Sequence, residues 1–265
     1  MLMPHTEPYV VASVRAAIAD LPVNASERDE VSNTDDPGDT DDPDDPDDPG
    51  DAPTLEEQAK AYVAQEAQHH AQHRRFNDIL LRHYPGLDRP ERAMAWVFAR
   101  LRRRSGRFGL AFAAGFECIA FIAARWVDQH QRLLRDADPT AVTLFMWHLA
   151  EEVEHKEVAW DVYEASGGGR LRYAWATWVA GFVLAGFSLW SAWVMMWSER
   201  RFFNPVAHLR LTGWSLSFIF VAVPVMVVSS LPGHHPRTMT NPAGFDHWLE
   251  TFDPETGTVA EWALP

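Results

Sequence analysis

The spacing of apolar residues along this chain is typical of helices. Residues 9–21 carry apolar side chains three and four positions apart, at Val10, Val14, Ala17 and Ile18, which is the pattern of a helix with one buried face. The sequence has no stretch of convincing length that alternates apolar and polar residues as a half-buried strand does. The pattern predicts an all-α fold, with further helices over residues 55–83, 90–104, 107–135 and 140–165.

Two segments near the C-terminal end are apolar on all sides. Residues 173–198 and 211–233 contain no charged side chain, and about 20 helical residues suffice to cross a bilayer core of about 30 Å. Five tryptophans lie towards the ends of the first segment, where interfacial aromatic residues prefer to lie. The sequence favours a membrane hairpin over two apolar core helices of a soluble bundle. Arginines on both sides leave the orientation open.

Acidic residues are concentrated in one short segment. Residues 35–51 hold ten aspartates, four prolines and no cation, so ten of the 14 net negative charges lie there. Such a segment buries too little apolar area to fold, so we expect a disordered linker, with an acidic binding tail as the alternative. The chain then divides into a first helix, an acidic insert, a helical bundle, a hydrophobic hairpin and a tail: 1–23, 24–53, 54–169, 170–233 and 234–265.

The composition indicates the cellular compartment in which we expect the protein. The single cysteine, Cys118, argues against a disulfide scaffold and suits a reducing compartment. The first twenty residues lack the cationic start and long apolar run of a secretory signal. No basic face is apparent, so nucleic acid is not an expected partner. With the apolar hairpin, these features predict a protein at the cytoplasmic side of the inner (cell) membrane, or otherwise a cytoplasmic one.

Two short Glu-x-x-His motifs carry the candidate chemistry. Glu66 and His69 lie in the predicted helix 55–83, and Glu152 and His155 in the predicted helix 140–165. A carboxylate and an imidazole three positions apart share one helical face and can bind the same ion. His73 and His148 fall on the same two stripes. One such motif is weak evidence, whereas two on separate helices indicate a metal site. Spacing alone also allows His70 to replace His69 as the ligand.

Two further glutamates complete a known donor pattern. Glu117 is the only acid in an otherwise apolar stretch, where an ionised side chain needs a metal or a cation. The alternative is a carboxyl group that is hydrogen-bonded to a neighbouring Tyr, Trp or Arg. Glu7 lies just before Pro8 and either supplies the last carboxylate or simply begins the first helix. One Glu from each of two helices, with Glu-x-x-His from each of two others, is the pattern of ferritin-like di-iron and di-manganese bundles. We therefore predict a ferritin-like helical bundle with a C-terminal hydrophobic helical hairpin.

The same motifs resemble a bacterial family described as predicted metal-dependent hydrolases. The similarity runs through EPYVVASVR (7–15), QEAQHHAQH (65–73), GFECIA (115–120), WHLAEEVEHKEVAWDVY (147–163) and HHP (234–236). The resemblance implies metal ligands at Glu7, Glu66, His69, Glu117, Glu152 and His155, with His73 and His148 nearby. Cys118 stands where relatives usually have His, and Pro8 replaces a more ordinary helix residue.

Neighbouring side chains are expected to support these ligands. Asp161 and Tyr163 could hydrogen-bond the ligand imidazoles, or could have ordinary roles on the helix surface. Glu151 and Glu154 are expected to face solvent or to pair with Lys156 and arginines.

Four carboxylates and two imidazoles suit two divalent ions, with iron preferred and manganese possible. Such a centre could catalyse hydrolysis or, with redox-active ions, oxidation of a hydrophobic or lipid-like substrate. An enzyme is expected to have an apolar cavity near Phe108, Phe112, Phe116 and Phe121. The alternatives are a non-catalytic metal-binding module tethered to the membrane, and a membrane protein whose acids and histidines only stabilise packing. A homo-oligomer is possible in each case.

Overall fold

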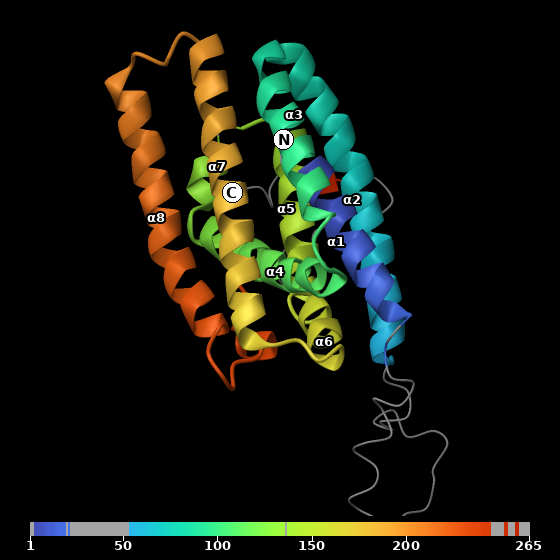
Figure 1. The fold of residues 1–265 in the computed structure, drawn as a ribbon. Coiled ribbons are helices and arrows are strands. Elements are labelled where there is room, and N and C mark those ends of the chain that lie inside the picture. Colours follow the sequence, from blue (N-terminus) through green and yellow to red (C-terminus); the bar gives the residue numbers. More distant parts are fainter. Residues whose placement is uncertain are drawn as a thin grey trace, which may run out of the picture.

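The computed structural model describes residues 3–19, 21, 53–135 and 137–244, together with the backbone of 252–253 and 258–259. The all-α prediction is confirmed (Figure 1). The helices are α1 Met3–Ile18, α2 Leu55–His83, α3 Asp88–Leu101, α4 Gly106–Gln129, α5 Pro139–His155, α6 Val158–Ala165, α7 Arg170–Ser198 and α8 Pro205–Ser229. Single 3₁₀ turns cover Pro85–Leu87, Gln131–Leu134 and Pro236–Thr238, and two-residue strands β1 (Phe252–Asp253) and β2 (Thr258–Val259) pair antiparallel. Except for Pro53, the predicted acidic insert lies outside the described residues.

Local sequence signals explain where the central helices begin. The Thr54 side chain accepts a hydrogen bond from the Glu57 backbone N–H, and the Glu57 carboxylate accepts one from the Thr54 N–H at 2.9 Å. This reciprocal pair caps α2 at the predicted position. Ser105 accepts from the Phe108 N–H at the start of α4, and Asp138 accepts from the Ala141 N–H at the start of α5.

Three predicted helices differ in the structure, one of them being 107–135, which ends at Gln129. The first helix begins at Met3 rather than near residue 9, so Glu7 and Pro8 lie inside α1. Pro8 is tolerated because its missing N–H removes a single hydrogen bond close to the helix start. The predicted helix 140–165 is broken into α5 and α6. The break lies at the buried Lys156, whose ammonium donates to Asn241 Oδ1 at 2.6 Å and to the Met239 carbonyl.

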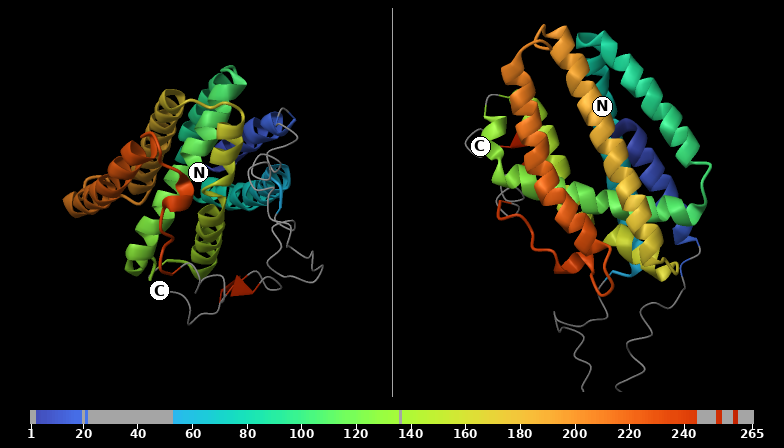
Figure 2. Two further views of the ribbon diagram at one scale, coloured as in Figure 1. Left: turned by 90° about the horizontal axis from the view of Figure 1, so that it is seen from below. Right: turned by 60° about the vertical axis from the view of Figure 1, so that its left-hand side comes forward.

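Helix α4 occupies the centre of the molecule. Its residues 109–122 are buried on every side, which explains why that stretch is apolar all round. α4 contacts α1, α5, α6, α7 and α8, and it crosses the other long helices rather than running beside them (Figures 1 and 2). Aromatic rings of α1, α3 and α4 pack edge to face beside it: Tyr9, Phe98 and Phe112. The structure confirms the helical class, and the ferritin-like arrangement stays a prediction.

The predicted hydrophobic hairpin forms two long helices, α7 and α8, that lie side by side at one edge of the molecule (Figure 1). In the described part of the chain, α4, α7 and α8 have the length and apolar composition that a membrane crossing requires. α4 is enclosed by protein, whereas most of the side chains in α7 and α8 remain exposed or half-buried. The two helices thus leave a large apolar surface uncovered.

Candidate metal centre

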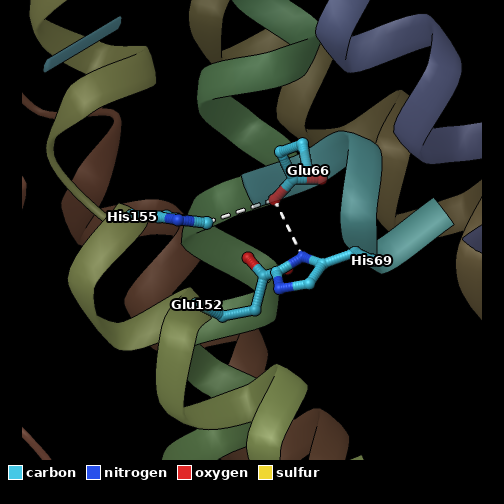
Figure 3. Close-up of side chains that lie close together, drawn as sticks. All are labelled: Glu66, His69, Glu152 and His155. Atoms are coloured by element: carbon cyan, nitrogen blue, oxygen red, sulfur yellow. Dashed lines mark hydrogen bonds and ion pairs between the residues drawn. The ribbon is translucent and has the colours of Figure 1, made fainter. Parts of the chain in front are cut away.

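The two Glu-x-x-His motifs face each other across the gap between α2 and α5. Glu66 and His69 project from α2, and Glu152 and His155 project from α5 (Figure 3). One donor atom from each of the four side chains lies within 4.8 Å of the other three. All four are buried, although each can carry a charge. The helical spacing predicted from the sequence therefore brings both motifs to one point.

Glu66 is the centre of this group. Its Oε1 atom lies 3.1 Å from His155 Nδ1 and 3.3 Å from His69 Nδ1 (Figure 3). Burial opposes ionisation of Glu66, but the hydrogen bonds with His155 and His69 outweigh it and lower the pKa of Glu66 to about 2. Both imidazoles thus direct their Nδ1 atoms towards the same carboxylate.

Glu117 of α4 adjoins this group from the core side. Its Oε1 atom accepts a hydrogen bond from the buried Tyr62 hydroxyl of α2. Burial and the negative charge of Glu66 raise the pKa of Glu117 to about 7. Burial and the charges of Glu117 and Glu66 likewise raise the pKa of Glu152 well above its ordinary value. The carboxylates are therefore close enough to disfavour one another's ionisation.

Glu7 forms a second group with His69 and His148, whose donor atoms also lie within 4.8 Å of one another. Glu7 is fully buried in α1, with His73 Nε2 at 3.6 Å and His70 Nδ1 at 3.7 Å. Burial and the charge of Glu66 raise the pKa of Glu7 to about 9. A helix-start acid in solvent would show neither feature, so Glu7 belongs to the cluster.

Several buried polar atoms of this cluster have no hydrogen bond to other described residues and could bind a cation. Neither oxygen of Glu7 or Glu152 has a hydrogen-bond partner in the described part of the chain, nor has Glu66 Oε2 or Glu117 Oε2. In that same part, the ion-pair partners of Glu7, Glu66 and Glu152 are all histidines. Leaving several carboxylate oxygens buried and unpaired is costly, and a divalent ion would remove that cost. The donor set therefore fits a divalent metal.

Comparison with known protein families matches residues 48–240 to the family described as "Predicted metal-dependent hydrolase". The chain belongs to this family. The match contains both Glu-x-x-His motifs and Glu117, whereas Glu7 lies before it. Neither the curated proteins nor the solved structures contain a match to the chain.

Two side chains outside the predicted set orient the histidines. His69 Nε2 contacts the Glu151 carboxylate of α5, and His155 Nε2 lies 2.9 Å from Gln65 Oε1 of α2. An ion bound at Nδ1 leaves the imidazole proton on Nε2, where a hydrogen-bond acceptor holds the ring in place. The residue before each motif's glutamate therefore contacts the histidine of the other motif.

The prediction that Glu151 faces solvent or pairs with Lys156 is wrong, because its carboxylate reaches across to α2. Its neighbour Glu154 is exposed as expected. Sequence reasoning also missed Gln65 and Tyr62. For Glu151 and Gln65 the signal was their place directly before the motif glutamates.

Some of the other predicted neighbours belong to the cluster of glutamates and histidines, and the rest lie away from it. His148 and His73 belong to the cluster: both are buried, and His148 Nε2 lies 3.2 Å from Glu152 Oε1. Burial lowers the pKa of His148 well below its ordinary value and that of His73 to about 4, so both are neutral and able to bind a metal. His70 is about one-third exposed and faces Glu7, so His69 is the α2 histidine of the four-residue group.

Cys118, Asp161 and Tyr163 lie away from the ligands. Cys118 faces Tyr173 and Ser229. Asp161 pairs with His235 at 2.8 Å, and Tyr163 donates to the Gly169 carbonyl, so neither contacts a ligand imidazole as predicted. The reason is the break at Lys156, which separates α6 from the register of α5.

Proposed function

We propose that this protein is a metal-dependent hydrolase with a dinuclear divalent-metal centre. Glu66, His69, Glu152 and His155 would hold the ions, with Glu117 and Glu7 completing the set. The observation that carries the proposal is the convergence of buried, unpaired carboxylate oxygens and imidazole nitrogens from four helices. The family description supports metal-dependent hydrolysis.

The donor set favours iron or manganese over structural zinc, which prefers four-ligand sites with thiolates. Divalent ions held here would supply Lewis-acid activation for hydrolysis, and redox-active ions would also support oxygen chemistry. The chain's own residues would orient the ligands through Glu151 and Gln65. His148 and His73 would supply neutral nitrogens beside Glu152 and Glu7.

Oxidation of a hydrophobic substrate is the second candidate function. Its support is the oxygen-rich set of four glutamates and the apolar surface of α7 and α8, which suits a lipid-like substrate. Three of the phenylalanines that were predicted to lie beside a cavity, Phe112, Phe116 and Phe121, are buried in the core. A pocket of about 20 Å³ between α4, α5 and residues 242–244 holds no more than about one water molecule. A non-catalytic metal-binding module is therefore the alternative that the experiment must address.

The test is activity after controlled metal replacement. The purified chain is stripped with a chelator and reloaded with Fe²⁺, Mn²⁺ or Zn²⁺. It is then assayed for hydrolysis of esters of increasing acyl length and for oxygen uptake with the same lipids. We expect hydrolysis that depends on reloading and is absent from the Glu152→Ala, His155→Ala double variant.

Oxygen uptake without hydrolysis would favour the second candidate. Metal binding without either activity would favour the binding module.

A further inference from the structure

Most of the side chains exposed on the surface of α7 and α8 are apolar. Phe182 is 71% exposed and Phe220 is 75% exposed, although both are large aromatic residues. Other exposed side chains continue this surface along both helices, among them Trp175, Trp193, Leu216 and Val228. We call this surface the apolar face. An uncovered apolar area of this kind indicates an interaction surface.

The positions of the neighbouring helices limit how a membrane can contact the apolar face. The turn before α3 contacts the C-terminal end of α7, where the Tyr84 hydroxyl donates to Glu199 Oε1 at 3.0 Å. Trp160 of α6 packs against Tyr173 at the other end, with the rings 4.7 Å apart. Helix α3 contacts α7 between these points, and α2 extends over the same span of the molecule farther from α7 (Figures 1 and 2). Other helices and turns of the protein therefore contact α7 at both of its ends and between them.

Those flanking helices carry exposed charges, including Arg74 and Arg75 on α2 and Arg92 on α3. If α7 and α8 crossed a bilayer in this arrangement, these arginines would lie at the depth of the hydrocarbon. A charged side chain is strongly disfavoured there. A face that lies flat on the bilayer avoids this cost, because α2 and α3 then remain in water.

The charged residues near the apolar face indicate which kind of partner it binds. The whole chain has a net charge of −14, yet residues 170–237 contain six arginines and one acidic residue, Glu199. Exposed arginines stand at both ends of α7 and α8: Arg172, Arg200, Arg201, Arg210 and Arg237. Anionic lipid headgroups attract such residues. A second copy packed two-fold through the same face would bring arginines against arginines.

We propose that the apolar face of α7 and α8 binds flat in one leaflet of an anionic phospholipid membrane, with both ends of α7 on the same side of the bilayer. The aromatic and aliphatic side chains would enter the acyl boundary. The arginines at the helix ends would contact the phosphates. This proposal rests on the arrangement of the helices and does not depend on the metal centre.

The first test is vesicle flotation of the full chain, with vesicles of phosphatidylcholine alone and vesicles containing phosphatidylglycerol. We expect binding to the phosphatidylglycerol vesicles at least about 10-fold stronger, with the difference reduced by salt. The Phe182→Glu, Phe220→Glu variant should lose at least about 10-fold of this binding. Ile79→Glu is the matched control, because Ile79 is 51% exposed on α2. Circular dichroism and metal content verify that each variant is folded.

The second test distinguishes flat binding from crossing. Gly169→Cys and Ser198→Cys place one exposed thiol at each end of α7, while the native Cys118 is buried. The variants are added to preformed, sealed phosphatidylglycerol vesicles and treated with a membrane-impermeant maleimide. Equal labelling of both ends without detergent supports the proposal.

Three outcomes would overturn the proposal. They are protection of one end of α7 from the maleimide until detergent opens the vesicles, equal binding to both kinds of vesicle, and a stable soluble dimer that does not bind vesicles.

Discussion

At the scale of single residues, the two motif histidines are held in the same way. Each directs Nδ1 towards Glu66 and places Nε2 against an acceptor from the opposite helix, Glu151 or Gln65. This geometry orients an imidazole for metal binding through Nδ1. The acceptors should therefore matter for affinity although they do not touch the ion.

Glu151→Ala should weaken metal binding by about 10-fold to 100-fold, because His69 loses the acceptor that fixes its ring. The measurement is a chelator-competition titration. Glu154→Ala is the control, since Glu154 is exposed in the same helix. Equal affinities in the two variants would show that Glu151 has no role in positioning His69.

Metal affinity should rise with pH between about 6 and 10. In the metal-free protein the pKa is raised to about 9 at Glu7, to about 7 at Glu117 and to about 10 at His69. For the two glutamates the main cause is burial, whereas at His69 contacts with Glu151 and Glu66 outweigh burial. Protons therefore compete with the ion for these groups, and binding releases them.

Calorimetric titrations in buffers of different ionisation enthalpy count these protons. Affinity that does not change with pH, or proton uptake on binding, would contradict the assignment of these residues as ligands.

The same pKa shifts affect the stability of the metal-free protein. Glu7 and Glu117 bind a proton more tightly in the folded state than at the ordinary value of 4.5. Their contribution to the free energy of unfolding therefore decreases as the pH rises from 4.5 through about 7 and about 9. Glu66 acts oppositely, because its lowered pKa gives stability that is present above 4.5 and lost towards pH 2.

At the scale of the helices, close packing of α4 against α7 holds Glu117 in place. A Cβ atom added at Gly115 would lie 2.8 Å from the Thr177 Cα atom of α7. Backbone cannot rotate away as a side chain can, so the two helices would have to separate. Gly115 is two residues before Glu117, and this contact therefore connects the hairpin to the metal centre.

Gly115→Ala should lower the free energy of unfolding by about 1–3 kcal/mol, as overpacking of a core does. Gly106→Ala in the same helix meets nothing within 4 Å and should change it by less than about 1 kcal/mol. Chemical denaturation of both variants provides the comparison. Equal stabilities would show that the contact between α4 and α7 is not tight in solution.

The spacing of apolar residues predicted most of the helices, and the exceptions have physical reasons. The predicted helix 55–83 coincides with α2, and the uncharged segments 173–198 and 211–233 lie close to α7 and α8. No glycine or proline in the sequence marks the break between α5 and α6. The break lies at Lys156, whose ammonium contacts Met239 and Asn241, residues that are distant in the sequence. The motif faces were likewise predictable from spacing. The contacts of Glu151 and Gln65 were not, because sequence does not specify how one helix is rotated against another.

At the scale of the whole molecule, the proposed metal centre takes its side chains from four helices, α1, α2, α4 and α5. Without an ion, both oxygens of Glu7 and Glu152 and one oxygen each of Glu66 and Glu117 are buried without hydrogen bonds within the described ranges, which opposes folding. Because an ion binds only the folded chain tightly, it should stabilise the entire bundle.

Reloading metal-free protein with Mn²⁺ at 100 times its Kd should stabilise it by about 2.7 kcal/mol. For a chain of this size, that corresponds to a rise in Tm of about 5–10 °C. Thermal unfolding followed by circular dichroism gives the value. The Glu152→Ala, His155→Ala variant should show no rise, and an equal rise in that variant would place the ion elsewhere.

The most direct test of the metal centre is the metal content of the purified protein. Elemental analysis of the intact chain should find about two iron or manganese ions per molecule. The Glu152→Ala, His155→Ala variant, folded by circular dichroism, should contain almost none. A folded native chain that stays free of stoichiometric metal after reconstitution with both ions would contradict the account.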